Sequence, residues 1–73
     1  MGKVVLVPGA SSGLGLATAA YLYEKGFTVY AGARSYREET VERRGGEAGE
    51  LHRVFLDVSD ENSVEALVER VVR

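Results

Sequence analysis

The stretch Pro8–Gly15, which reads P-G-A-S-S-G-L-G, decides the fold of this chain. The aliphatic run V-V-L-V at residues 4–7 precedes it, and a segment with helical apolar spacing follows from Gly13. A continuous apolar run predicts a strand buried on both faces, as in parallel sheets. A glycine-rich turn between such a strand and a helix is typical of phosphate-binding loops. The stretch therefore predicts an α/β fold with a phosphate site at this turn.

Each glycine of the turn has its own expected task. Gly9 allows a sharp exit from the strand, Gly13 lets backbone amides approach a pyrophosphate, and Gly15 lets the helix pack closely on the sheet. A tight turn can also use glycine for purely structural reasons, but three glycines with two serines between these elements favour the phosphate site. Leu16 and Ala17 stand where a P-loop needs Lys followed by Ser or Thr, which excludes that kind of loop.

The first helix is expected to begin at Gly13 and to end at Lys25 and Gly26. A cation suits the negative end of the helix dipole, and glycine can take the left-handed conformation that ends a helix. Its predicted core face consists of Leu14, Ala17, Thr18, Tyr21 and Leu22.

The rest of the chain continues the alternation of strand and helix. Strands are predicted over residues 27–31 and 53–56, and a short solvated helix over residues 36–44. Residues 45–49 (GGEAG) are predicted to be a flexible connection. Ser59 or Asp60 is expected to cap a last helix. The apolar positions of that helix are Val64, Leu67, Val68, Val71 and Val72.

This order predicts the fold class. Three strand-helix units without hairpin-length connections indicate a Rossmann-like doubly wound parallel sheet, of which only the first βαβαβα half is present. Residues 1–73 are therefore expected to form the N-terminal half of a dinucleotide-binding domain, with no second domain in this chain.

Composition narrows the function classes. With 45% hydrophobic and 27% charged residues the chain is an ordinary globular protein. Its formal net charge of −2 argues against nucleic acid as the main partner. The absence of cysteine excludes disulfides and thiolate metal sites. No apolar stretch resembles a signal peptide or a membrane span, so we expect a cytoplasmic protein without a membrane partner.

Together these motifs resemble the short-chain dehydrogenases/reductases, whose usual text at the turn is T-G-A-S-S-G-I-G. The resemblance continues at residues 31–34 (AGAR) and 56–58 (LDV), and so covers essentially the whole chain. It implies that Asp57 takes the adenine amino group and that the Val58 backbone completes the adenine edge. Pro8 departs from the family's threonine, whose hydrogen bond holds neighbouring strand ends together, so the turn is expected to be less well braced. The resemblance also implies phosphate and ribose contacts from Ser11, Ser12 and Leu14.

The cofactor can be argued from charge. NAD binders place an acid at the end of the second strand, ~20 residues past the loop, to hold the ribose 2′-hydroxyl. Gly32 and Ala33 stand there, and Arg34 follows with a guanidinium suited to a 2′-phosphate. The sequence therefore favours NADP(H), with Ser12 and either Ser35 or Arg37 near the phosphate. The alternative is that Arg34 is simply a surface arginine, as Arg43 and Arg44 are expected to be.

No catalytic residue is predicted in this chain. Tyr21 and Lys25 match the family's Tyr-x-x-x-Lys spacing, but the helix carries them ~9 and ~15 Å beyond Gly15, so core packing and a helix-end cation account for them. His52, the only histidine, is expected to be structural or exposed. The family's catalytic Ser, Tyr, Lys and Asn lie downstream of this region.

The sequence thus indicates the cofactor-binding segment of an NADP(H)-dependent short-chain oxidoreductase, which moves hydride between nicotinamide and a small-molecule carbonyl or alcohol. The intact protein is expected to be a homo-oligomer. A non-catalytic NADP(H)-binding sensor of the same fold is the alternative, and a structural fragment is a third.

Overall fold

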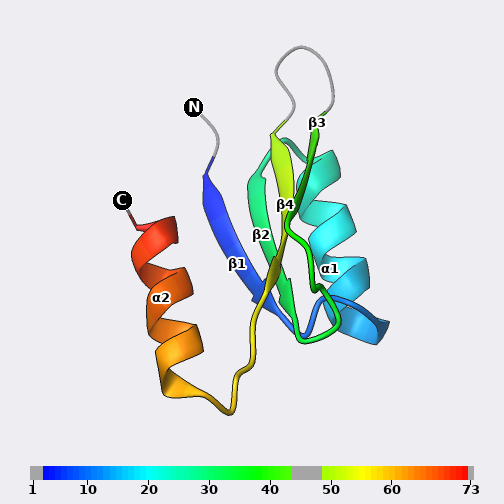
Figure 1. The fold of residues 1–73 in the computed structure, drawn as a ribbon. Coiled ribbons are helices and arrows are strands. Elements are labelled where there is room, and N and C mark those ends of the chain that lie inside the picture. The colour runs from blue at the N-terminus through cyan, green and yellow to red at the C-terminus, as the bar shows by residue number, and fades with distance from the viewer. Residues whose placement is uncertain (1–2, 44–48, 73) are drawn as a thin grey trace.

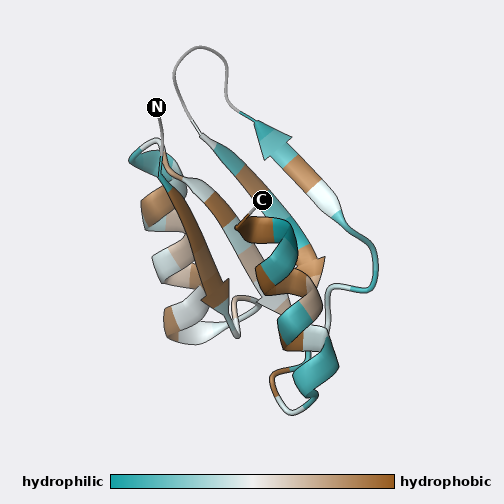
Figure 2. Cartoon of the chain, turned by 90° about the vertical axis from the view of Figure 1, so that its left-hand side faces the viewer, coloured by the Kyte–Doolittle hydropathy of each residue, from teal (hydrophilic) through white to brown (hydrophobic). Residues whose placement is uncertain are grey.

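A computed structural model describes residues 3–43 and 49–72, and in them it shows one four-stranded sheet with a helix on each face (Figures 1 and 2). The elements are β1 (Val4–Pro8), α1 (Gly13–Glu24), β2 (Thr28–Ala33), β3 (Thr40–Arg43), β4 (Glu50–Phe55) and α2 (Glu61–Val71). The strand order is β1-β2-β4-β3, with β1, β2 and β4 parallel. This is a partial Rossmann-like α/β fold in which β1 and β3 form the two edges of the sheet.

The glycines at the turns of the β1–α1–β2 unit match the prediction. Gly9 and Gly13 have φ angles of 63° and 60°, the left-handed region that favours glycine. A Cβ added at Gly15 would lie against the Gly9 carbonyl group, 2.9 Å from its carbon, so the close approach of α1 to the turn requires glycine there. Gly26 ends the helix with a φ of 93°, as its position after Lys25 predicts.

The predicted helix over residues 36–44 is wrong. Residues 40–43 form strand β3, which pairs antiparallel with β4, so the element order is βαβββα and the sheet is mixed rather than parallel throughout. The two strands form a hairpin, so the expectation that hairpin-length connections are absent is also wrong. The expected flexible connection falls mostly on residues 44–48, which lie outside the described residues.

The edge of β4 explains why this segment is a strand. Thr40 and Val41 are β-branched, which favours an extended backbone over a short helix. Pairing with β4 also satisfies backbone groups that a four-residue solvated helix would leave open. Opposite charges then face each other across the hairpin: Arg43 Nε lies 2.6 Å from Glu50 Oε2, and Arg53 Nη2 lies 2.9 Å from Glu42 Oε1.

Two small cores hold the helices to the sheet. The core under α1 is built from Val7, Ala10, Ala19, Tyr23, Val29, Ala31 and Leu51. The core under α2 is built from Val54, Leu56 and Leu67. Asp60 caps α2 by accepting a hydrogen bond from the Asn62 amide at 3.0 Å, which confirms one of the two predicted caps.

The predicted core face of α1 is largely wrong. Leu14, Ala17 and Tyr21 are exposed, and the helix buries Ala19 and Tyr23 instead. The sequence G-L-G-L-A-T-A-A-Y-L-Y is apolar or small on every side, so periodicity cannot select one face. The close packing at Gly15 sets the rotation of the helix, because Ala19 and Tyr23 follow it at steps of four residues.

Neither α1 nor α2 is long and apolar enough to cross a membrane.

Candidate functional site

A pocket lies where the carboxyl ends of β1, β2 and β4 meet, at the lower end of the sheet in Figure 1. Its volume is about 510 Å³. Three chain segments supply its walls: the turn after β1, the turn after β2 and the segment after β4. The lining residues are Gly9, Ser11, Ala33, Arg34, Ser35, Leu56, Asp57, Val58 and Ser59.

The first wall is the glycine turn. The Ala10 amide donates a hydrogen bond to the Gly32 carbonyl at 3.0 Å, which ties the turn to the end of β2. The Ala10 carbonyl accepts a hydrogen bond from the Tyr36 hydroxyl at 3.1 Å. Apart from the adjoining residues and the backbone of α1, no described atom lies within 4 Å of a Cβ built at Gly9 or at Gly13, so the backbone is open on the side where each side chain would stand.

The second wall is a β-turn from Ala33 to Tyr36. The Tyr36 amide donates to the Ala33 carbonyl at 3.3 Å, and the Leu56 amide donates to the same carbonyl at 3.1 Å. Arg34 and Ser35 are the two central residues of this turn, and both are exposed. In the part of the chain that the structure describes, no carboxylate lies within ion-pair distance of the Arg34 guanidinium.

The third wall follows β4. Asp57 Oδ1 accepts hydrogen bonds from the Ser59 amide at 3.0 Å and from the Ser59 hydroxyl at 2.7 Å. These two bonds, assisted by the positive charge of Arg34, hold the pKa of the Asp57 carboxyl below its ordinary value. The Asp57 amide in turn donates to Ser63 Oγ at 3.1 Å, which anchors the segment to α2. Asp57 is therefore an ionised carboxylate in a fixed position on the pocket wall.

The structure brings together five of the nine residues predicted for cofactor binding. Those in the pocket lining are Gly9, Ser11, Arg34, Asp57 and Val58. The other four lie outside the lining, at or next to the start of α1: Ser12, Gly13, Leu14 and Gly15. Their part in binding stays a prediction. Ser12 is the N-cap residue of α1, but its side chain makes no capping hydrogen bond.

The other four lining residues, Ala33, Ser35, Leu56 and Ser59, were not among the nine predicted, and two of them have a signal in the sequence. Ser59 follows Asp57 at the spacing of an Asx-turn, in which the carboxylate binds a backbone amide two residues on. Leu56 belongs to the L-D-V motif, and a Cβ at Gly32 would lie 2.7 Å from its side chain. Gly32 is therefore needed for Leu56 to pack against the end of β2.

Pro8 fits the end of β1 without disturbing the ladder to β2. The Thr28 amide donates to the Lys3 carbonyl at 2.9 Å, so the backbone groups of Lys3 point toward β2. Because these groups alternate in direction along a strand, the nitrogen of Pro8 points away from β2 toward the open edge, where a missing N–H costs no bond within this sheet.

The Tyr21 and Lys25 pair lies outside the pocket lining. Tyr21 is exposed rather than part of the core, which corrects the prediction, and the Lys25 ammonium lies 5.3 Å from the centre of its ring. This cation–π contact at the end of α1 is a surface feature.

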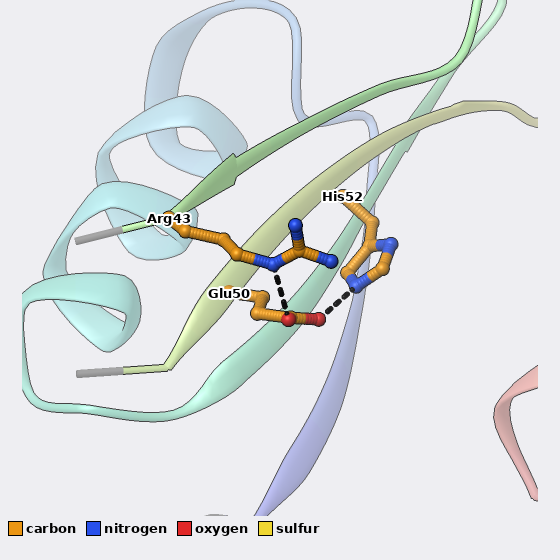
Figure 3. A network of polar contacts seen from close by, with 3 residues as sticks. All are labelled: Arg43, Glu50 and His52. Carbon is orange, nitrogen blue, oxygen red and sulfur yellow. Dashed lines mark hydrogen bonds and ion pairs between the residues drawn. The ribbon is translucent and has the colours of Figure 1, made fainter. Parts of the chain in front are cut away.

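His52 belongs to a separate polar network on the hairpin (Figure 3). Its Nε2 lies 2.9 Å from Glu50 Oε1, and its ring stacks on Tyr30 with the ring centres 4.4 Å apart. The structural role expected for His52 is thus observed, but its carboxylate partner was missed; Glu50 lies two residues earlier, on the same face of β4. Hydrogen bonds from Arg43 and from His52 lower the pKa of Glu50. Among the described residues, no three His, Cys, Asp or Glu side chains are grouped as metal ligands.

The open α/β sheet, with a pocket at the strand carboxyl ends beside a glycine turn and a helix N-terminus, defines a protein of the Rossmann-like class. The chain belongs to the short chain dehydrogenase family, because the sequence model of that family matches residues 3–73. No solved structure gives a significant match.

Relatives of similar sequence support the family. The chain is 35% identical over 74 residues to a 3-oxoacyl-[acyl-carrier-protein] reductase of Thermotoga maritima, which covers 99% of this chain and 30% of the relative. It is 44% identical over 71 residues to a cis-4-hydroxycyclohexanecarboxylate dehydrogenase of Sinomonas cyclohexanicum, with 93% and 28% covered. A 3-oxoacyl-[acyl-carrier-protein] reductase of Staphylococcus aureus is 35% identical over 75 residues, with 99% and 30% covered. The chain therefore spans less than a third of the length of these relatives.

Proposed function

We propose that this chain is the cofactor-binding part of an NADP(H)-dependent oxidoreductase that transfers hydride between nicotinamide and a carbonyl or alcohol carbon. The observation that carries the proposal is the position of Arg34. It stands on the pocket wall directly after β2, next to the place where NAD-binding proteins of this fold carry an acid and where this chain has Gly32 and Ala33. No described carboxylate lies within ion-pair distance of it.

The residues present fit a dinucleotide. The open space beside Gly9 and Gly13 is where a pyrophosphate would approach the backbone, and a Cβ at either position would enter it. The N-terminus of α1 supplies amides and the positive end of its dipole to the same place. Ser11 adds a hydroxyl donor to the pocket lining.

The proposed adenosine site has a positive side chain, Arg34, at one end and a negative one, Asp57, at the other. Arg34 offers a planar set of donors to a 2′-phosphate, and its neighbour Ser35 offers a hydroxyl. Asp57 uses Oδ1 for Ser59, which leaves Oδ2 to accept from an adenine amino group. Since its pKa is lowered, this carboxylate stays ionised and remains an acceptor throughout the neutral range.

The bound cofactor would supply the hydride chemistry through its nicotinamide ring. The residues of this chain hold and orient the adenosine and diphosphate portion, and we assign no catalytic step to them. The names of the relatives, two reductases and a dehydrogenase, favour an enzyme over a sensor for the intact protein.

Replacing Arg34 tests the proposal. Arg34→Ala should weaken NADPH binding by ~1.5–3 kcal/mol, the typical value of a charged hydrogen bond, and should leave NADH binding nearly unchanged. Fluorescence titration of the intact protein with both cofactors measures this. Lys25→Ala, which removes one positive charge outside the pocket lining, is the matched control and should change neither affinity. Equal losses for the two cofactors, or tighter binding of NADH by the unmutated protein, would contradict the proposal.

A further inference from the structure

Ala10 is held on both sides by the end of β2 and the residues that follow it. It is completely buried. Its amide donates to Gly32 in β2, and its carbonyl accepts from the hydroxyl of Tyr36, three residues past the end of that strand. Peptide groups buried in this way need partners, because an unpaired buried carbonyl is costly. The Tyr36 hydroxyl therefore holds the glycine turn in place by satisfying the Ala10 carbonyl.

Tyr36 also closes the turn that carries Arg34 and Ser35. Its amide bonds to the Ala33 carbonyl, which makes it the last residue of that β-turn. Its ring packs against the core under α1, so the side chain has little freedom to move. Tyr36 thus ends the Ala33–Tyr36 turn through its backbone amide and binds the glycine turn through its hydroxyl.

These contacts define the distance between two walls of the pocket. The glycine turn supplies Gly9 and Ser11, and the Ala33–Tyr36 turn supplies Arg34 and Ser35. A dinucleotide with a 2′-phosphate must meet both walls at once, because its diphosphate and its 2′-phosphate are attached to the same ribose and can separate only to a limited distance. An error of about 1 Å in that spacing is enough to weaken a charged, directional contact.

We propose that Tyr36 is a positioning residue that sets Arg34 at the correct distance from the glycine turn, so that preference for the 2′-phosphorylated cofactor depends on its hydroxyl. This inference rests on the proposed function. It adds a role for Tyr36, which would position Arg34, the residue proposed to bind the 2′-phosphate.

A double-mutant cycle with Arg34 tests the role of Tyr36. Tyr36→Phe keeps the ring in its core and removes only the hydroxyl. It should weaken NADPH binding by ~3–10-fold, the usual range for one neutral hydrogen bond, and NADH binding by much less. In protein that already carries Arg34→Ala, the same substitution should change NADPH affinity by less than ~2-fold, because there is no guanidinium left to position. Tyr21→Phe, at an exposed tyrosine outside the pocket lining, is the matched control and should have no effect.

The outcomes separate this inference from the proposed function. If Arg34→Ala spares NADPH binding, the cofactor preference itself is wrong. If Arg34→Ala behaves as expected but Tyr36→Phe costs the same in both backgrounds, or weakens both cofactors equally, the positioning role is overturned. A lower melting temperature with an unchanged ratio of NADPH to NADH affinity would also overturn it, since it would show a purely structural tyrosine.

Discussion

The β1–α1–β2 unit and the β3–β4 hairpin are specified in different ways. In the first, Val29 and Ala31 are almost completely buried, and glycines with left-handed φ angles determine where the chain turns. In the hairpin, every residue of β3 is exposed, and ion pairs such as Arg43–Glu50 accompany the strand pairing. The conformation of the first region is therefore determined by its own glycines and buried side chains. The conformation of β3 is determined by its pairing with β4.

The energetic scales of the two regions differ accordingly. Full burial of one valine contributes ~1.5–3 kcal/mol to folding. An exposed ion pair contributes ~0–1 kcal/mol, because water screens it and both side chains lose freedom. We therefore expect substitutions in the first unit to dominate both stability and binding, and substitutions in β3 to be tolerated.

The largest effect should come from the glycine turn. Gly13→Val should lower NADPH affinity by more than ~100-fold, because a β-branched side chain at a left-handed position is strained by ~1–3 kcal/mol and also enters the space open to a phosphate. Titration measures the affinity, and circular dichroism checks that the protein is folded. Ala20→Val, at an exposed position of the same helix, is the control and should bind normally. Near-normal affinity in folded Gly13→Val protein would refute the phosphate role of the turn.

One substitution made in both regions compares them directly. Val29→Ala in β2 should lower the free energy of unfolding by ~1.5–3 kcal/mol, because it leaves a cavity at a completely buried site. Val41→Ala in β3, where the side chain is half exposed, should change it by less than ~0.5 kcal/mol. Urea unfolding of both variants gives the two values. Equal losses would mean that β3 is as much a part of the core as β2.

A small effect that depends on pH should come from the ion pair that joins α2 to the segment before β3. Arg70 donates two hydrogen bonds to Glu39, at 2.6 and 3.0 Å, and thereby lowers the pKa of Glu39 below its ordinary value. A carboxyl whose pKa is lower in the folded than in the unfolded protein stabilises the fold fully at pH values above its unfolded pKa. This stabilisation is lost as the pH falls through the lowered pKa of the folded protein. Glu39→Gln should therefore cost up to ~1 kcal/mol near neutral pH and nothing in strong acid.

The free energy of unfolding, measured from neutral pH down to strong acid, would show the effect. Glu65→Gln, at an exposed position of α2, is the control. A cost for Glu39→Gln that persists or grows in acid would contradict the sign of the shift.

The comparison also explains which features could be predicted. Gly9, Gly13 and Gly26 indicated their turns because only glycine adopts those φ angles easily, and the Asp60 cap followed from its position before an amphipathic helix. The prediction failed where the deciding contact lies far away in sequence. The strand at residues 40–43 depends on pairing with β4, and the buried face of α1 depends on Gly15 meeting the Gly9 carbonyl.

The candidate site was predictable to a similar extent. Motifs around Gly9, Arg34 and Asp57 mark three walls that the structure brings into one pocket. The bond from Tyr36 to Ala10 has no local signal, because it joins two turns that are neighbours only once β1 and β2 have paired.

The register of the strands carries a consequence for the time course of folding. Arg43 and Glu50 are only seven residues apart in the chain, whereas Val4 must find Thr28 across the whole of α1. Closing a short loop costs less entropy than a long one, and hairpins form within microseconds. We therefore expect the pairing of β3 with β4 to form early although β3 contributes least to stability, and the glycine turn to reach its final shape only when β1 docks late beside β2.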